Sequence, residues 1–152
     1  MRSRAWAFAG VILAMSLGLG LALTGRARAA DPAPVRIVSA WIRQLPAGVP
    51  AGGYLALENQ SNRPVALTSV SSAAFGEVDL HRTISEHGVM SMQPVDRIVI
   101  APHSTLEFAA QGYHLMLMRP VHPLTPGEQV PLTLHFQGAP DLQVAAEVRT
   151  HE

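Results

Sequence analysis

Four methionines and two histidines form the pattern in this sequence that is best suited to bind a metal ion. Beyond residue 30, methionine occurs at four positions only, and these are Met90, Met92, Met116 and Met118. His81 and His114 lie on the same strand-like segments or next to them. Thioether is a soft ligand and imidazole an intermediate one, so the set suits Cu(I), whereas Mg²⁺, Ca²⁺ and Mn²⁺ prefer oxygen and Zn²⁺ takes Cys, His or carboxylate. Both donor types are uncharged, which favours a singly charged ion.

Three short segments must place these side chains, and their composition predicts strands. The predicted strand 114–118 contains His114, Leu115 and Met116. In a strand, successive side chains point to opposite faces. The histidine and both methionines of this strand therefore share one face, and its two leucines share the other. The remaining ligands lie on predicted strands 78–83 and 89–95.

The segment Glu86-His87-Gly88 predicts a hairpin turn between these two strands. If residues 86 and 87 form the turn, His81 lies directly opposite Met92, and Thr83 lies opposite Met90. Residues paired in this way have Cβ atoms about 4.5–5.5 Å apart, close enough to share an ion. His81, Met92, His114 and Met116 can then converge from three strands.

The alternative is that these residues only stabilise the fold. Methionine commonly fills cores, and a single histidine on a strand more often makes a structural hydrogen bond. The confinement of all four methionines to two strands, each beside a histidine, favours the metal site. Met90 and Met118 are accessory candidates that could line the approach, act as alternative ligands or pack.

The rest of the chain predicts an all-β domain. Short runs rich in Val, Ile, Leu and Thr alternate with Pro and Gly turns, which is typical of an antiparallel sandwich or small barrel. Further strands are expected at 35–43, 53–59, 65–70, 97–101, 105–108, 130–136 and 144–149. Residues 71–75 could form a short turn of helix. Trp41 and Tyr54 are expected in the core, and His87, His103, His122 and His135 on turns or outward faces.

The N-terminus resembles an export signal. Two arginines in the first four residues precede an uncharged run over residues 5–25, followed by Ala27-Arg28-Ala29, an A-x-A cleavage site. We therefore expect a signal peptide over 1–29 and one domain over 30–152 that works outside the cytoplasm. The uncharged run is long enough to span a bilayer, so an uncleaved anchor is the alternative.

Charge and composition exclude several classes of protein. Residues 30–152 carry 7 Arg, no Lys and 11 acidic residues, a net charge of −4, which argues against binding to nucleic acid. The absence of cysteine excludes disulfides, thiol catalysis, iron–sulfur clusters and blue-copper sites. No Gly-x-Ser-x-Gly, Walker or dinucleotide motif is present, and four protein ligands would leave an ion no open position, so we expect no enzyme activity.

The spacing of the four ligands resembles that of the periplasmic copper chaperone family called PCuAC. Its signature is a His, ten residues, a Met, twenty-one residues and then His-x-Met, which His81, Met92, His114 and Met116 match. Ala40-Trp41-Ile42-Arg43, Gly53-Tyr54-Leu55 and the segments around the ligands are also similar to the family. Two features differ: Arg82 stands where some members have a further Met, and Thr150-His151-Glu152 stands where some have a His- and Met-rich tail, so we do not expect Cu(II) capture by such a tail.

The resemblance implies a cupredoxin-like Greek-key β-barrel that binds one Cu(I) through these four residues. It also implies delivery of copper towards the CuA centre of cytochrome c oxidase subunit II, with a Sco-type partner. We expect a monomer with a shallow site, because a carrier must release its ion by ligand exchange. Two other functions are alternatives to a copper chaperone. One is a copper-buffering or resistance protein without a dedicated acceptor, and the other is a non-metal β-sandwich scaffold.

Overall fold

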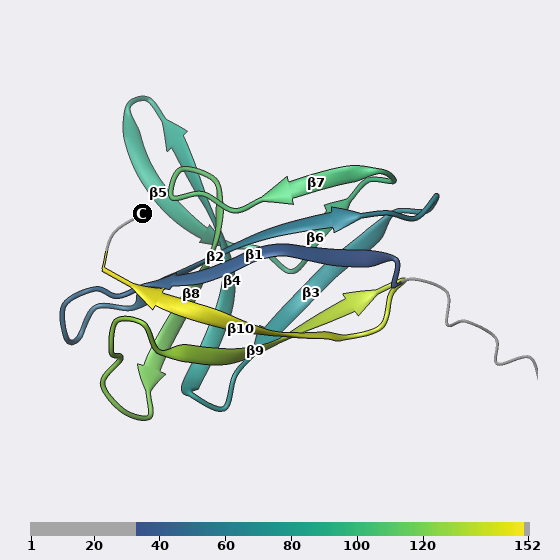
Figure 1. The fold of residues 1–152 in the computed structure, drawn as a ribbon. Coiled ribbons are helices and arrows are strands. Elements are labelled where there is room, and N and C mark those ends of the chain that lie inside the picture. The colour runs from purple at the N-terminus through teal and green to yellow at the C-terminus, as the bar shows by residue number, and fades with distance from the viewer. Residues whose placement is uncertain (1–32, 151–152) are drawn as a thin grey trace, which may run out of the picture. The chain divides into compact units, whose positions relative to one another are not determined.

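The computed structural model describes residues 33–150, and this part of the chain is all-β (Figure 1). The strands are β1 (Val35–Arg43), β2 (Ala51–Asn59), β3 (Val65–Ser71), β4 (Phe75–Glu86), β5 (Val89–Pro94), β6 (Ile98–Ile100), β7 (Ser104–Glu107), β8 (Tyr113–Pro120), β9 (Gln129–Gln137) and β10 (Leu142–Arg149). Each predicted strand corresponds to one of these, with ends that differ by up to three residues. The helical turn considered for 71–75 is wrong: Ala73 and Ala74 form a turn that leads directly into β4.

The strands form one sheet, and its order shows crossovers typical of a Greek key. The order is β5-β4-β8-β2-β1-β10-β9-β3-β6, with β7 also paired to β2. Neighbours are antiparallel with one exception, because β1 and β10 run parallel over Trp41–Arg43 and Glu147–Arg149. The prediction of a wholly antiparallel sheet is therefore corrected at this pair, where the first and last strands of the domain meet.

The core comes from one face of nearly every strand. Leu115 and Leu117 on β8 are fully buried, as are Leu132 and Leu134 on β9, and the residues between them are more exposed or polar. Together with residues of β1, β2, β3, β4, β6 and β10 they form a single buried cluster. The period of two that predicted the strands thus also predicted which leucines are buried.

The β4–β5 hairpin extends beyond this core. Figure 1 shows it projecting from the rest of the domain, and all six residues of β5 are exposed. β4 is long enough to take part in both regions: Phe75 and Leu80 are buried in the core, whereas Ser85 and Glu86 near its end are exposed. The site predicted from the sequence lies where the hairpin leaves the core.

The predicted signal peptide, or anchor, over residues 1–29 lies outside the described residues. Among residues 33–150 no helix is long and apolar enough to cross a membrane.

Candidate metal site

The two histidines of the predicted site face each other across neighbouring strands. β4 pairs with β8 in a register that places His81 directly opposite His114. Their ring centroids are 6.0 Å apart, with an angle of 50° between the ring planes. Bonds from a metal to an imidazole nitrogen are about 2 Å long, so two rings at this separation can both reach one ion between them. The pairing of β4 with β8, strands far apart in sequence, makes this arrangement.

Each ring holds a buried nitrogen that has no hydrogen-bond partner in the described structure. These atoms are Nδ1 of His81 and Nε2 of His114. The other nitrogen of His114, Nδ1, donates to the carbonyl oxygen of Gly112 at 3.2 Å. That hydrogen bond places the proton on Nδ1 and leaves a lone pair on Nε2, which is how a metal-binding histidine is commonly oriented. Buried polar atoms without partners are costly, so this pair of nitrogens fits a bound cation.

Burial keeps the His114 ring in the form that binds metals. Desolvation lowers the pKa of His114 below its ordinary value of 6.5, the hydrogen bond to Gly112 raises it, and the nearby charge of His81 lowers it further. The net effect is a lower pKa. A neutral imidazole with a free lone pair is a ligand, whereas an imidazolium is not, so proton competition at this ring is weakened.

Met116 lies on the same face of β8 as His114, two residues further along the strand. Its cross-strand neighbours are Asp79 on β4 and Gly52 on β2. Gly52 presents no side chain to this face, and Met116 is half-buried. Met118 lies two residues further along the same face of β8, opposite Glu77, and is also half-buried. The alternation predicted for β8 is therefore confirmed, with both methionines on one face and both leucines buried on the other.

The predicted register of the β4–β5 hairpin is wrong by two positions. Thr83 lies opposite Met92, Ser85 opposite Met90, and His81 opposite Pro94. The turn residues are His87 and Gly88, with φ of 53° and 79°, instead of residues 86 and 87. A two-residue turn of type I′ needs positive φ at both positions, which favours glycine at the second.

A shift of two positions keeps every side chain on its original face. Met92 therefore remains on the same face as His81, as a diagonal neighbour. Diagonal neighbours are about 7–8 Å apart, within reach of long side chains. The structure thus places His81, His114, Met116 and Met92 on one continuous face of three adjacent strands.

The residues of this face on β8 and those on β5 differ in exposure. His114 is only 5% exposed, whereas Met92 and Met90 on β5 are 59% and 53% exposed. Solvent therefore reaches the face from the β5 side and at the partly exposed His81, whereas His114 is covered. This agrees with the shallow site expected for a carrier.

Thr83 is a residue that the ligand pattern did not identify. It is 8% exposed, its hydroxyl donates to the carbonyl of Ala110 at 2.9 Å, and its N–H donates to the carbonyl of Gly112 at 3.0 Å. The Gly112 carbonyl thus accepts hydrogen bonds from both Thr83 and His114. Thr83 holds the turn that orients the His114 ring, and its position two residues from His81, on the same face, was the available signal.

No group of three or more His, Cys, Asp or Glu residues between 33 and 150 is placed to hold a metal ion. The set of two histidines and two methionines therefore stays a prediction.

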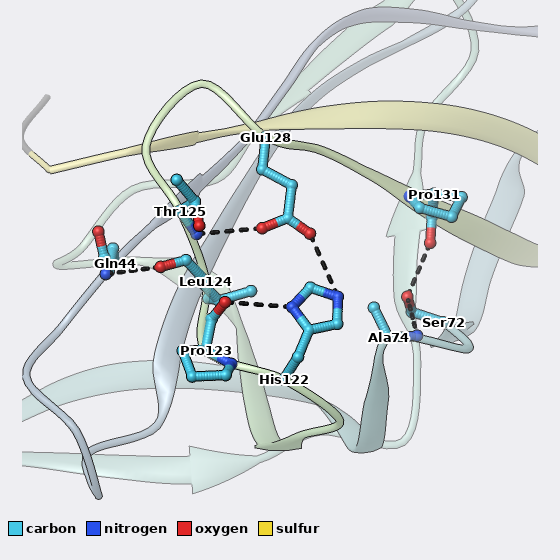
Figure 2. A network of polar contacts seen from close by, with 9 residues as sticks. All are labelled: Gln44, Ser72, Ala74, His122, Pro123, Leu124, Thr125, Glu128 and Pro131. Carbon is cyan, nitrogen blue, oxygen red and sulfur yellow. Dashed lines mark hydrogen bonds and ion pairs between the residues drawn. The ribbon is translucent and has the colours of Figure 1, made fainter.

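The other histidines lie elsewhere and make their own contacts. His103 bonds Asn62 at 2.7 Å on the surface. Figure 2 shows His122 with Nδ1 near the Pro123 carbonyl at 3.1 Å and Nε2 near Glu128 at 3.5 Å. This network borders a cavity of about 630 Å³ between residues 44–51 and 117–124, which Met118 also lines but His81 and His114 do not.

His135 takes part in a hydrogen-bonded chain that the sequence did not reveal. Its Nε2 lies 2.8 Å from the Ser71 hydroxyl and its Nδ1 lies 2.7 Å from the Asp141 carboxylate. The hydrogen bond from His135 lowers the pKa of Asp141. These contacts join β3, β9 and the β9–β10 turn on the outer surface, as expected for an outward-facing His135.

The strand order and the His/Met face define the described residues as a small all-β Greek-key domain with a candidate metal-binding face. The family model described as "Putative lipoprotein LpqE-like" matches residues 35–148, and the chain belongs to this family. A curated relative, "Putative lipoprotein Lxx21020" of Leifsonia xyli subsp. xyli, is 29% identical over 116 residues, covering 76% of this chain and 69% of that protein.

Solved structures similar to this chain include two PCuAC domains and a protein from Deinococcus radiodurans. The apo PCuAC domain from PmoF1 has a TM-score of 0.67 at 19% identity, covering 80% of this chain and 98% of that one. The copper-bound PCuAC domain from PmoF2 has a TM-score of 0.65 at 26% identity, covering 78% and 94%. The solution structure of CuI-DR1885 from Deinococcus radiodurans has a TM-score of 0.60 at 26% identity, covering 80% of each chain. The predicted cupredoxin-like fold is therefore confirmed.

Proposed function

We propose that this protein is a copper chaperone of the PCuAC type that carries one Cu(I) on His81, Met92, His114 and Met116. The main support is the pair of buried, unpartnered nitrogens on facing rings, because a bound cation would satisfy both. Two similar structures, the PmoF2 domain and CuI-DR1885, are described as holding copper. The donor set adds the chemical argument, since thioethers and imidazoles together suit Cu(I).

Ion transfer follows from the unequal exposure of the ligands. His114 holds the ion from the buried side and His81 is partly exposed, while the exposed Met92 is the ligand that an incoming donor can replace first. Thioethers are neutral and flexible, so one can leave without exposing a charge. Met90 lies further out along β5, opposite Ser85, and Met118 borders the cavity at the other end of β8. Neither is needed to complete a four-ligand site.

The proposed place of action is the periplasm, and the proposed acceptor is the CuA site of cytochrome c oxidase subunit II, with a Sco-type protein as a second partner. The family description as a lipoprotein supports export. We propose that the carrier acts as a monomer and catalyses no reaction.

Competition for Cu(I) tests the binding step. The domain 30–152 is titrated anaerobically with Cu(I) in the presence of bathocuproine disulfonate, and one equivalent should bind tightly. His114→Ala and Met92→Ala should each weaken binding by more than tenfold, whereas His87→Ala, an exposed turn residue of the same hairpin, should not. A wild-type domain that binds no Cu(I) would support the non-metal scaffold, and unchanged tight binding in both variants would show that these two residues are not ligands.

Transfer separates a chaperone from a buffering protein. The Cu(I)-loaded domain is mixed with the apo soluble domain of cytochrome c oxidase subunit II, and copper on each protein is measured after separation. Transfer faster than spontaneous copper loss supports the chaperone. Tight binding without transfer would support a copper-buffering protein.

A further inference from the structure

The outer edge of β5 is an open strand edge beside the candidate copper site. β5 lies at the end of the sheet order and pairs on one side only, with β4. The hairpin projects from the domain, so this edge is not covered by the strands of the core (Figure 1). All residues from Val89 to Pro94 are exposed.

The register shows which backbone groups of this edge are free to pair. In a hairpin with a two-residue turn, the residues that flank the turn, here Glu86 and Val89, form a hydrogen-bonded pair, and such pairs then alternate with non-bonded ones. The hydrogen bond from Val95 N–H to the Leu80 carbonyl, at 2.9 Å, continues the same alternation. The N–H and C=O groups of Met90 and Met92 therefore point away from β4.

This edge lacks the usual protection against pairing with another chain. Exposed edges are commonly guarded by charged residues or prolines. The sequence VMSMQP carries no charge, and its proline comes last. Val89, Met90 and Met92 are 68%, 53% and 59% exposed. An extended, uncharged segment of another protein could add to the sheet here, as in other cases of strand addition.

We propose that the copper acceptor docks on this edge through an extended strand that pairs with the backbone of Met90 and Met92. The inference rests on the proposed function. A strand paired at Met92 places its own side chains about 4.5–5.5 Å from that residue, on the exposed side of the ligand face. A soft donor carried by the strand would then meet the ion where Met92 can be replaced. Met90 acts as a docking residue.

The size of the edge favours a transient acceptor over a second copy of this chain. A six-residue strand is about 20 Å long, and only two of its residues offer free backbone pairs. Stable dimers usually bury about 1,200–2,000 Å² or more in total, which one short strand does not supply. A brief encounter is what a carrier needs.

Hydrogen exchange of single amides tests the proposed pairing. In the free ¹⁵N-labelled Cu(I) domain, the amides of Met90 and Met92 should exchange faster than those of Ser91 and Gln93. Addition of the apo soluble domain of cytochrome c oxidase subunit II should protect Met90 and Met92 selectively, at least tenfold. Protection elsewhere on the domain, with these two amides unchanged, overturns the docking site.

A matched pair of variants isolates the outward N–H. Met90→Pro and Met90→Leu both remove the thioether, but only proline removes the N–H, and it breaks no bond to β4. Bathocuproine disulfonate should withdraw copper from both variants at the same rate, while transfer to the subunit II domain should be at least tenfold slower for Met90→Pro. Equal transfer rates contradict the proposal.

The remaining outcomes also distinguish the two proposals. A wild-type domain that binds no Cu(I) refutes the proposed function itself. If copper is bound and released to the chelator but is not transferred to the subunit II domain, the acceptor and the docking mode are both wrong. A dimer in sedimentation that Met90→Pro abolishes would make the occupant a second copy and overturn the acceptor assignment.

Discussion

Replacement of Thr83 by valine tests whether the residues behind His114 determine copper binding. Valine has nearly the same shape but cannot donate to the Ala110 carbonyl, so the 2.9 Å hydrogen bond is lost. Ala110 itself is exposed, and water can partly replace the donor. We therefore expect a loss in the free energy of unfolding of about 1 kcal/mol, near the middle of the range for a single hydrogen bond.

The effect on copper binding should be larger than this small stability change suggests. The turn at 109–112 carries the Gly112 carbonyl, which sets the proton on His114 Nδ1. Loss of partners behind a metal ligand commonly costs 10–100-fold in affinity. Thr83 acts one step further away, so we expect about a tenfold loss of Cu(I) affinity, or about 1.4 kcal/mol.

The assay is Cu(I) competition with bathocuproine disulfonate, combined with ¹⁵N NMR of the His114 ring. Thr83→Val should weaken binding and raise the population of the other ring tautomer, whereas Thr83→Ser, which keeps the hydroxyl, should restore both. Ser85→Ala is the control, an exposed hydroxyl two residues along the same face of β4. Wild-type affinity and an unchanged tautomer in Thr83→Val would refute the reasoning.

Three further substitutions test the fold, two of them near the site and one on the outer surface of β9. Gly53→Ala should destabilise the domain by about 1–3 kcal/mol in urea denaturation, because its Cβ would lie 2.9 Å from Leu115 Cβ; an unchanged midpoint would contradict the packing described. Gly88→Ala should cost about 1 kcal/mol at a φ of 79°, visible as faster hydrogen exchange in β5, and exchange at the wild-type rate would argue against the turn. Asp141→Asn tests acid stability. The hydrogen bond from His135 lowers the folded-state pKa of Asp141 from 3.8. The Asp141 carboxylate therefore stabilises the fold above pH 3.8, and this stabilisation is lost as the pH falls through the folded-state pKa. The wild-type melting temperature should therefore exceed that of Asp141→Asn near neutral pH and approach it in acid, whereas a constant difference would show that the carboxylate has no such role.

The ligand face of β8 could be predicted from the sequence because strand periodicity is local. His114 and Met116 alternate with Leu115 and Leu117, and burial of the leucines leaves the other two on the opposite face. The same logic located the strands that carry the other two ligands. The predicted register of the β4–β5 hairpin was wrong by two residues. A shift by an even number leaves each side chain on its face, so the prediction that His81 and Met92 share a face still holds.

The hairpin register could not be derived from strand composition, since it depends on backbone dihedrals at the turn. Placing the turn at 86 and 87 left Gly88 unused, although a type I′ turn favours glycine second. His87 instead adopts a φ of 53°, a conformation that non-glycine residues rarely take. The sequence does carry one signal for the correct turn, because Gly88 suits the second position of a type I′ turn.

The sequence by itself determined the types of the proposed ligands, their spacing and their shared face, since these follow from side-chain chemistry and from the two-residue period of a strand. The tertiary structure alone decided that β4 lies beside β8, which brings two histidine rings together from positions 33 residues apart. It also decided that Thr83 and Gly112 meet behind His114 and that the edge of β5 stays open. Such contacts depend on the order of strands in the sheet, which is a property of the whole packed core and is not encoded in any single segment.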